Sequence, residues 1–264
     1  MTMRDAIAKT GACLSAAAVV LAALTVSHAQ ARTLAEIKSR GAIELCANPD
    51  ALPYASEKGE APGFQIELAR ALAQRLGVEL RVLWIYPHYR ANWVNCDIVM
   101  DAFSDPKVHE GKLKLSVPYQ KSGVALALAP GVPPVQTFDE VQPPAKVGVM
   151  IGSLASVVLG KKGLRTSPYS FESDMIDDLL RGEIQAAAIS PAKVAYYNHT
   201  HPDRPLGLAY AYDHEAELGW TVSVGMRKAD DALVEAVNPV LIEMLTDGTV
   251  DRIYAKYGVE HRTP

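Results

Sequence analysis

The chain of 264 residues is 49% hydrophobic and 21% charged, and its formal net charge is −4. These values are typical of a globular protein, and the slight negative charge argues against nucleic acid as a partner. The length is enough for one large domain or for two lobes of about 100 residues each.

Residues 1–31 have the features of a secretory signal peptide. A short positively charged region is followed by an apolar stretch from Ala12 to Val26, and Ala29-Gln30-Ala31 forms a small-x-small cleavage site. Nearly all of the apolar stretch follows Cys13 instead of preceding it, which argues against a lipoprotein signal. We therefore expect cleavage after Ala31, export to the periplasm and a mature protein with no membrane insertion.

Residues 43–83 predict a strand–loop–helix–strand unit. A short strand runs into the Pro-rich loop Asn48–Tyr54. A helix then opens at Phe64 and stops at Gly77, and a second strand covers residues 79–85. Units of this kind build parallel α/β sheets, in which ligands bind at loops beyond the carboxyl ends of the strands. The loop Asn48–Tyr54 is therefore the first candidate for ligand binding.

Further segments follow in an order that is typical of one protein family. They are Asp97–Met100, Ser116–Tyr119, Lys146–Val149, Ile151–Ser153, Leu179–Ala186, Val224–Asp230 and Asp247–Gly258. Together with the first unit, they resemble the family-3 periplasmic solute-binding proteins, which are receptors of many ABC importers. The resemblance implies a two-lobed α/β periplasmic binding protein of type II. Each lobe would be a doubly wound, mostly parallel sheet, with the ligand cleft between the lobes.

The same resemblance implies how the chain is divided. Lobe 1 would hold residues 32–122 and 219–264, and lobe 2 would hold residues 123–218 with the hinge strands. The crossovers would lie near Tyr119–Gly123 and Tyr210–Gly219. We expect a monomer that binds a small molecule and meets an ABC permease.

Two residues that amino-acid receptors of this family carry are absent. After the third strand, such receptors place an Arg that forks onto the α-carboxylate of the ligand. The equivalent stretch Phe103–Glu110 contains Lys107 but no Arg. They also place an Asp after a second-lobe strand to hold the α-ammonium, and here that strand is followed by Ser190. The resemblance therefore argues against an α-amino acid as the ligand.

Five short segments point to a subfamily within this family. They are Cys46–Pro49, Leu52–Tyr54, Glu57–Gly59, Tyr86–Arg90 and Cys96–Met100. They resemble the quinoprotein-dehydrogenase-associated solute-binding proteins found with methanol dehydrogenases that use pyrroloquinoline quinone (PQQ), although residues 91–95 are shorter than the segment those proteins have there. This resemblance implies a receptor for PQQ, a planar anionic cofactor, or for another aromatic polyanion. The alternative is an accessory protein that docks onto a periplasmic quinoprotein dehydrogenase.

Residue types near the expected cleft suit a flat, anionic ligand. Aromatic faces stack on planar rings, and Arg or Lys side chains pair with carboxylates. Gly152 and Ser153 are expected to present backbone N–H groups at a helix N-terminus. For each aromatic residue the alternative is packing in the core. The candidate ligand-binding residues are Asn48, Tyr54, Tyr89, Arg90, Trp93, Asp101, Phe103, Ser104, Lys107, Tyr119, Gly152, Ser153 and Ser190.

The mature chain keeps two cysteines, Cys46 on the first strand and Cys96 before the third. In a lobe of strand order 2-1-3 these strands are neighbours, so a bridge between them fits the geometry. An even number of cysteines in an oxidising compartment also favours a disulfide. We expect this disulfide, the alternative being two buried free thiols.

Catalysis and metal binding have little support in the sequence. His199 and His201 would share a face only in an extended segment, Ser153 has no G-x-S-x-G elbow, and Asp101 and Asp105 suit a cleft or capping role. We therefore expect no enzymatic activity, no metal and no required cofactor. A transport receptor ranks first, a docking protein second, and a hydrolase or lyase on the same fold third.

Overall fold

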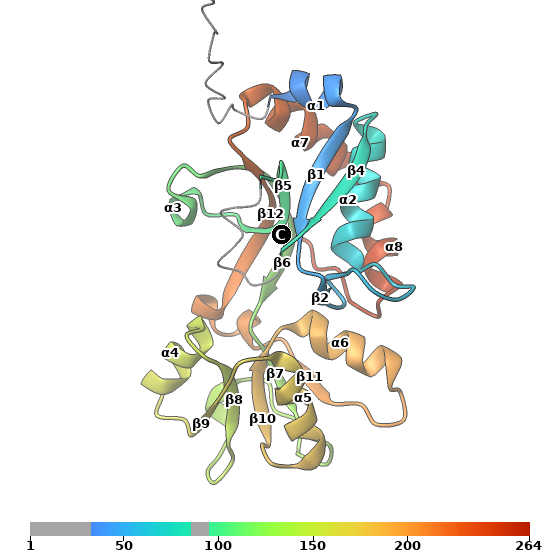
Figure 1. Ribbon diagram of the computed structural model, residues 1–264. Coiled ribbons are helices and arrows are strands. Elements are labelled where there is room, and N and C mark those ends of the chain that lie inside the picture. Colours follow the sequence, from blue (N-terminus) through green and yellow to red (C-terminus); the bar gives the residue numbers. More distant parts are fainter. Residues whose placement is uncertain (1–32, 86–94) are drawn as a thin grey trace, which may run out of the picture. The chain divides into compact units, whose positions relative to one another are not determined.

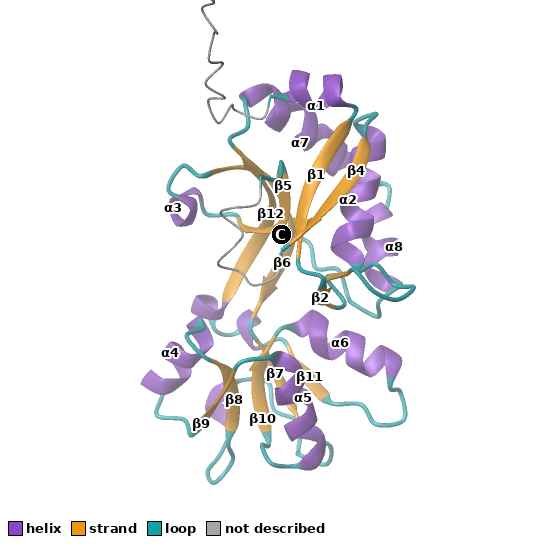
Figure 2. Cartoon of the chain, in the orientation of Figure 1, coloured by secondary structure: helices purple, strands orange, loops and turns teal. Residues whose placement is uncertain are grey.

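The computed structural model describes residues 33–85 and 95–264. Within these ranges, two five-stranded sheets and one two-stranded sheet are formed, and their strands and helices can be followed in Figures 1 and 2. The first large sheet with its helices is called lobe 1 below, and the second is called lobe 2. The expected signal peptide, residues 1–31, lies outside the described residues.

Lobe 1 is built on a sheet from two distant parts of the chain. Its strands are β1 (Ala42–Ala47), β4 (Glu79–Trp84), β5 (Ile98–Phe103), β6 (Leu113–Gly123) and β12 (Gly219–Arg227). They lie in the order β4-β1-β5-β12-β6. Strand β5 is longer than the expected third strand, so Asp101 lies within the strand and Phe103 ends it instead of lying in a loop.

Helices cover this sheet, and a small hairpin interrupts the loop after β1. The elements are α1 (Leu34–Arg40), β2 (Asp50–Ala51), β3 (Ala55–Ser56), α2 (Phe64–Arg75), α3 (Pro106–His109), α7 (Asp231–Thr246) and α8 (Thr249–Ala255). Helix α2 begins and ends as expected, and Gly77 follows it with φ of 66°. At Gly63 a Cβ atom would lie 2.4 Å from the Tyr54 carbonyl oxygen, so only glycine fits where α2 meets the loop.

Lobe 2 contains the second large sheet. Its strands are β7 (Ala125–Leu128), β8 (Val147–Met150), β9 (Thr166–Tyr169), β10 (Ala186–Ile189) and β11 (Gly207–Ala209), in the order β11-β7-β10-β8-β9. The helices are α4 (Leu154–Lys161), α5 (Glu172–Arg181) and α6 (Pro191–Thr200), with short 3₁₀ turns η2 (Phe138–Glu140), η3 (Ala211–Asp213) and η4 (Ala216–Leu218).

The prediction of mostly parallel sheets is confirmed, although each large sheet also contains one reversed strand. In lobe 1, β1 is parallel to β4 and β5, whereas β12 is antiparallel to β5 and β6. In lobe 2, β8 is parallel to β9 and β10, whereas β7 is antiparallel to β10 and β11. The reversed strand of lobe 1 is therefore β12, which follows the second crossover, and the reversed strand of lobe 2 is β7, which follows the first.

The apolar core is distributed differently in the two lobes. Alternate residues of a strand face opposite sides of the sheet. In lobe 2, Leu126 and Ala188 belong to one buried cluster, and their neighbours Ala127 and Ala187 belong to another, so both faces are apolar. In lobe 1, the alternate β1 residues Ile43, Leu45 and Ala47 face one large cluster that includes residues of α2, α7 and α8.

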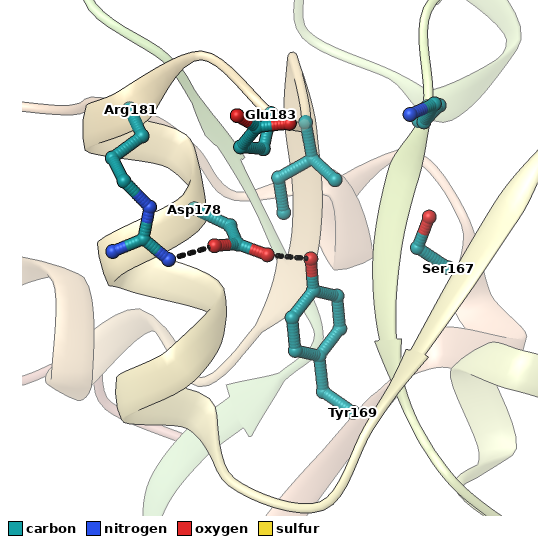
Figure 3. Close-up of a pocket in the computed structure, with 7 residues that line it drawn as sticks. Ser167, Tyr169, Asp178, Arg181 and Glu183 are labelled. Atoms are coloured by element: carbon teal, nitrogen blue, oxygen red, sulfur yellow. Dashed lines mark hydrogen bonds and ion pairs between the residues drawn. The ribbon is translucent and has the colours of Figure 1, made fainter.

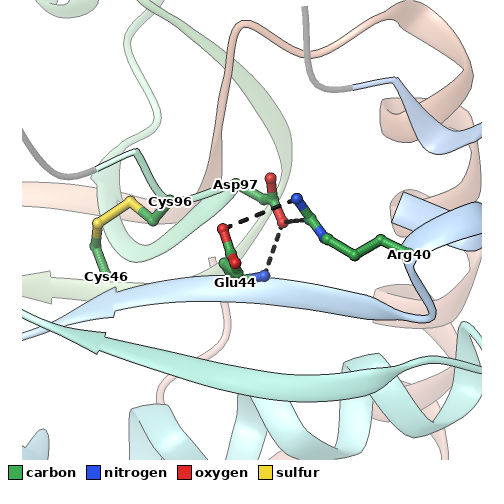
Figure 4. Close-up of a disulfide and its surroundings, with 5 residues drawn as sticks. All are labelled: Arg40, Glu44, Cys46, Cys96 and Asp97. Carbon is green, nitrogen blue, oxygen red and sulfur yellow. Dashed lines mark hydrogen bonds and ion pairs between the residues drawn. A yellow bond between two sulfur atoms is a disulfide. The ribbon is translucent and has the colours of Figure 1, made fainter. Parts of the chain in front are cut away.

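The opposite face of lobe 1 is held by a disulfide and an ion pair (Figure 4). Cys46 of β1 is bonded to Cys96, with Cα atoms 5.5 Å apart, which confirms the expected disulfide. The carboxylate of the fully buried Asp97 pairs with Arg40 and accepts a hydrogen bond of 2.8 Å from the Glu44 amide. Covalent and charged links therefore join β1 to the start of β5.

The chain passes between the sheets at two neighbouring places. Strand β6 ends at Gly123 and β7 begins at Ala125, while β12 begins at Gly219, paired with Gly123. Among the described residues, no helix is long and apolar enough to cross a membrane.

Candidate functional site

The loop after β1 is folded by local bonds that set the position of Tyr54. The Asn48 Oδ1 atom accepts from the Asp50 amide at 3.0 Å, and the Tyr54 amide donates to the Ala51 carbonyl at 2.8 Å. The Tyr54 ring packs 4.9 Å from the Phe64 ring, centroid to centroid. Its hydroxyl is thereby directed away from the lobe 1 core and hydrogen-bonds with the hydroxyl of Ser190.

Ser190 lies at the carboxyl end of β10 and caps helix α6. Its hydroxyl accepts from the Lys193 amide at 3.4 Å, and Pro191 occupies the first turn, where a missing N–H costs nothing. The Ser190 amide donates to Glu172 Oε1 at 2.8 Å. The Lys193 ammonium donates to the Leu52 carbonyl at 2.9 Å.

Two bonds therefore connect the lobe 1 loop to the start of α6, and α6 continues into the lobe 1 core. Ala192 is buried in the lobe 1 cluster, and the Tyr196 and Tyr257 ring centroids are 6.2 Å apart. The connected groups are a phenol, an alcohol, an ammonium and a carboxylate. Together they can recognise a polar ligand through both donors and acceptors.

Burial changes the pKa values of two of these connected side chains, Tyr54 and Glu172. Burial raises the pKa of the Tyr54 hydroxyl well above its usual value, and the neighbouring Glu172 charge raises it further. Burial also raises the pKa of Glu172, although the Ser190 amide and the Lys193 charge act in the opposite direction. Perturbed groups at the carboxyl ends of strands are typical of binding sites.

Glu172 and Lys193 were not among the residues predicted from the sequence. Glu172 is the first residue of α5, just beyond the carboxyl end of β9, and it follows the exposed Phe171. The rule that places ligands beyond the carboxyl ends of strands led to the loop after β1, whereas Ser190 was found by comparison with amino-acid receptors of the family. Applying it also to β9 would have found Glu172.

The predicted lobe 1 residues at the end of β5 have separate environments. Phe103 is 42% exposed, and its ring meets Trp220 edge-on at 5.2 Å. The Asp101 charge helps to raise the pKa of Tyr54, so Asp101 lies near the connected group. The Ser104 hydroxyl is bonded to the Ser223 hydroxyl at 2.8 Å, and Lys107 is exposed on α3.

The remaining predicted residues fall into three groups. Tyr119 is 1% exposed and donates its hydroxyl to the Met100 carbonyl, so its ring is part of the lobe 1 core. Gly152 and Ser153 precede α4, where the Ser153 hydroxyl caps the helix by accepting from Ser156 at 3.1 Å. The Ser153 amide already donates to Met150 within the turn. Residues Tyr89, Arg90 and Trp93 lie outside the described residues.

The histidine pair considered for metal binding is not extended. Helix α6 runs through Thr200, so His199 is helical, and the His201 ring stacks on Tyr197 with centroids 4.5 Å apart. Across residues 33–85 and 95–264, no group of three or more metal-ligating side chains comes together.

A polar pocket of about 470 Å³ lies elsewhere in lobe 2 (Figure 3). Lys146 and Glu183, which line it, precede β8 and β10, so it faces the amino ends of those strands. Its central carboxylate, Asp178, is paired with Arg181 and accepts from the Tyr169 hydroxyl at 2.6 Å. The hydrogen bond from Tyr169 is the main cause that lowers the pKa of Asp178. This network is already satisfied, and we do not assign the ligand to it.

Residues 43–260 match the family model of the bacterial extracellular solute-binding proteins, family 3. The chain belongs to this family. This solute-binding protein is 26% identical to the L-cystine-binding protein of Escherichia coli over 251 residues, which covers 92% of each chain.

Solved structures agree with this fold. An ancestral cationic amino acid solute-binding protein matches with a TM-score of 0.71 and 24% identity, covering 85% of this chain and 98% of the other. An amino acid ABC transporter substrate-binding protein from Streptococcus pneumoniae, bound to L-arginine, matches with a TM-score of 0.67 and 19% identity, covering 85% and 97%. At these identities the likeness establishes the two-lobed fold.

Proposed function

We propose that this solute-binding protein captures a small ligand between its lobes in the periplasm and delivers it to an ABC permease, without catalysis. The observation that carries the proposal is the pair of bonds from Tyr54 and Leu52 to Ser190 and Lys193. They bring polar groups of both lobes together where α/β sheets bind ligands. Closure of two lobes about a hinge buries a ligand at such a place.

For the ligand we propose a planar anion of the PQQ type. The stretch Phe103–Glu110 holds no Arg that could grip an α-carboxylate in a fork. Phe103 offers an exposed ring, and Lys193 offers a positive charge beside the loop. The resemblance of residues 46–59 and 86–100 to quinoprotein-associated receptors supports the same ligand.

A second candidate is a ligand that carries an amine, because a carboxylate reaches Ser190 from another element. Glu172 accepts from the Ser190 amide through Oε1. Glu172 can therefore supply a carboxylate at this end of β10, although position 190 itself is a serine. The relatives reported above bind cystine or arginine, which supports testing amino acids in parallel.

The experiment is isothermal titration calorimetry of the mature protein with PQQ and with a panel of amino acids. The same titrations are made on Glu172→Gln and on a control, Glu183→Gln, in the polar pocket of lobe 2. A PQQ-type anion should bind Glu172→Gln at least as tightly as the unchanged protein, because a repelling charge is removed. An amine-bearing ligand should bind Glu172→Gln about tenfold or more weakly than the unchanged protein, because the carboxylate that pairs with the amine is lost.

The control keeps the site intact and should bind as the unchanged protein does. Binding of PQQ by one site, with no heat from the amino acids, supports the first candidate. Binding of an amino acid that depends on Glu172 supports the second. If no ligand gives binding heat and the immobilised protein captures a quinoprotein dehydrogenase, the result would contradict transport and favour the docking role.

A further inference from the structure

The two crossovers between the lobes are packed tightly side by side. Strands β6 and β12 are paired up to Gly123 and Gly219, and the Val124 amide donates to the Leu218 carbonyl at 2.9 Å. At Gly123 a Cβ atom would lie 2.4 Å from the Tyr212 ring and 2.5 Å from the Leu218 oxygen. Any rotation between the lobes must be absorbed by these few residues.

The C-terminal segment after α8 runs back to this place. Tyr257 and Val259 are buried in the lobe 1 cluster, which directs the segment along β6. The His261 Nε2 atom lies 2.7 Å from the Tyr119 carbonyl oxygen, and the Lys121 amide donates to the Arg262 carbonyl at 2.7 Å. The backbone of the segment is thus attached to β6 immediately before the first crossover.

The side chain of Arg262 reaches the second crossover. Its guanidinium pairs with Asp213 Oδ2 at 2.7 Å and donates to the Tyr212 hydroxyl at 3.2 Å. It also lies 4.4 Å from the centroid of the Tyr210 ring, a cation–π distance. Tyr212 and Asp213 belong to η3 and Tyr210 directly precedes it, and Tyr212 is buried in a lobe 2 cluster.

Lys121 completes the network from the β6 side. Its ammonium pairs with Asp213 Oδ1 at 2.7 Å, so one carboxylate binds a cation from β6 and a cation from the C-terminus. Moving η3 away from β6 would break both ion pairs and the ring contacts at the same time. A network that must break as a unit resists motion more than its separate members do.

We propose that residues 259–262 form a C-terminal clamp that limits rotation of the lobes about the crossovers, with Arg262 as its anchor. Its backbone bond is to a strand of the lobe 1 sheet, and its side-chain bonds are to a turn in the lobe 2 core. The clamp is separate from the ligand-contacting residues and does not depend on which ligand is bound.

The test measures the spread of lobe positions in the ligand-free mature protein. Spin labels are attached to Arg70→Cys on α2 and Lys161→Cys on α4, both exposed positions in different lobes. The native cysteines are held in their disulfide and stay unlabelled. Pulsed electron double resonance then gives the distribution of distances between the labels.

Arg262→Ala should make this distribution about twice as wide, because the hinge loses its clamp. The matched control is Arg252→Ala. That arginine donates to the Asp247 carbonyl at 2.8 Å and to the Thr249 hydroxyl at 2.9 Å, at the start of α8, and should leave the distribution unchanged. No widening in Arg262→Ala, or equal widening in both variants, would overturn the proposal.

A conservative variant guards against a folding defect. Arg262→Lys keeps the charge beside Asp213 but loses the fork and the stacking on Tyr210, so it should widen the distribution by less than Arg262→Ala does. Widening that follows this order, with unchanged circular dichroism, supports the clamp. The measurement contains no ligand, so failure of the proposed transport function would not change its outcome.

Discussion

The faces of the two large sheets are stabilised in different ways in the two lobes. Lobe 2 buries apolar side chains on both faces of its sheet, many of them as small as alanine, as in the strand Ala186–Ile189. Lobe 1 places its large apolar cluster on one face and secures the other with the Cys46–Cys96 disulfide and the Arg40–Asp97 pair. A sheet face with little apolar packing can be held by covalent and charged links, and disulfides persist in the oxidising environments outside the cytoplasm.

Removing the disulfide should have the largest effect and should be concentrated in lobe 1. The bridge closes a loop of 50 residues, and the chain-entropy model gives such a loop about 4 kcal/mol of stability. We expect the double variant Cys46→Ala, Cys96→Ala to lose about this much free energy of unfolding in urea. Hydrogen exchange should show faster opening of β1 and β5 than of β8 and β10.

Equally faster hydrogen exchange in both lobes of the double variant would contradict this difference between the lobes. Lobe 1 would then depend on the disulfide no more than lobe 2 does. A thiol titration in denaturant without reductant should detect no free thiol in the unchanged mature protein.

Crowding the lobe 2 core should have an intermediate effect. At Gly148 of β8 a Cβ atom would lie 2.8 Å from Ile184 Cδ1 and 3.2 Å from the Met175 sulfur. Gly148→Ala should therefore lower the free energy of unfolding by about 2 kcal/mol, measured by urea denaturation. The control is Gly160→Ala in α4, where nothing lies within 4 Å of the added atom and the protein should gain up to about 1 kcal/mol. Similar results for both glycines would show that the lobe 2 faces are loosely packed.

Neutralising Glu172 should have the smallest effect, and one that depends on pH. Burial raises the folded-state pKa of Glu172 above the ordinary 4.5, so its ionised form is less favourable in the folded protein than in the unfolded chain. Stability should fall as pH rises from 4.5 through the raised pKa and then stay level. Glu172→Gln removes this loss and should be more stable than the unchanged protein at pH 7, with no difference below about pH 4. A variant that is less stable at pH 7 would mean that the charge helps to hold Ser190 and α6.

Much of the fold could be predicted because its signals are local. The span of α2 follows from apolar spacing and from Gly77, and the disulfide follows from the element order that makes β1 and β5 neighbours. The assignment to two lobes of a solute-binding protein came from short segments in a fixed order. The mostly parallel direction of the sheets was predicted, but the reversed strands β7 and β12 were not, because no local pattern shows which way a crossover strand runs.

The candidate site could be predicted only in part. Tyr54 and Ser190 were both expected, each beyond the end of its own strand, and the structure joins them across 136 residues of sequence. Tyr119 was expected at the cleft, but its ring is buried in the lobe 1 core and its hydroxyl donates to the Met100 carbonyl. A tyrosine within a strand carries no local sign of which face of the sheet its ring will pack on.

The sequence by itself therefore determined helix α2, the strand–loop–helix–strand unit at the start of lobe 1 and the family, and it favoured the cysteine pairing. Only the tertiary structure brought Glu172 to Ser190 and Arg262 to Asp213, over separations of 18 and 49 residues. Periodicity and turn residues act over a few positions, so they define elements one at a time. Contacts between elements depend on how the sheets close and where the chain ends, and these are properties of the whole fold.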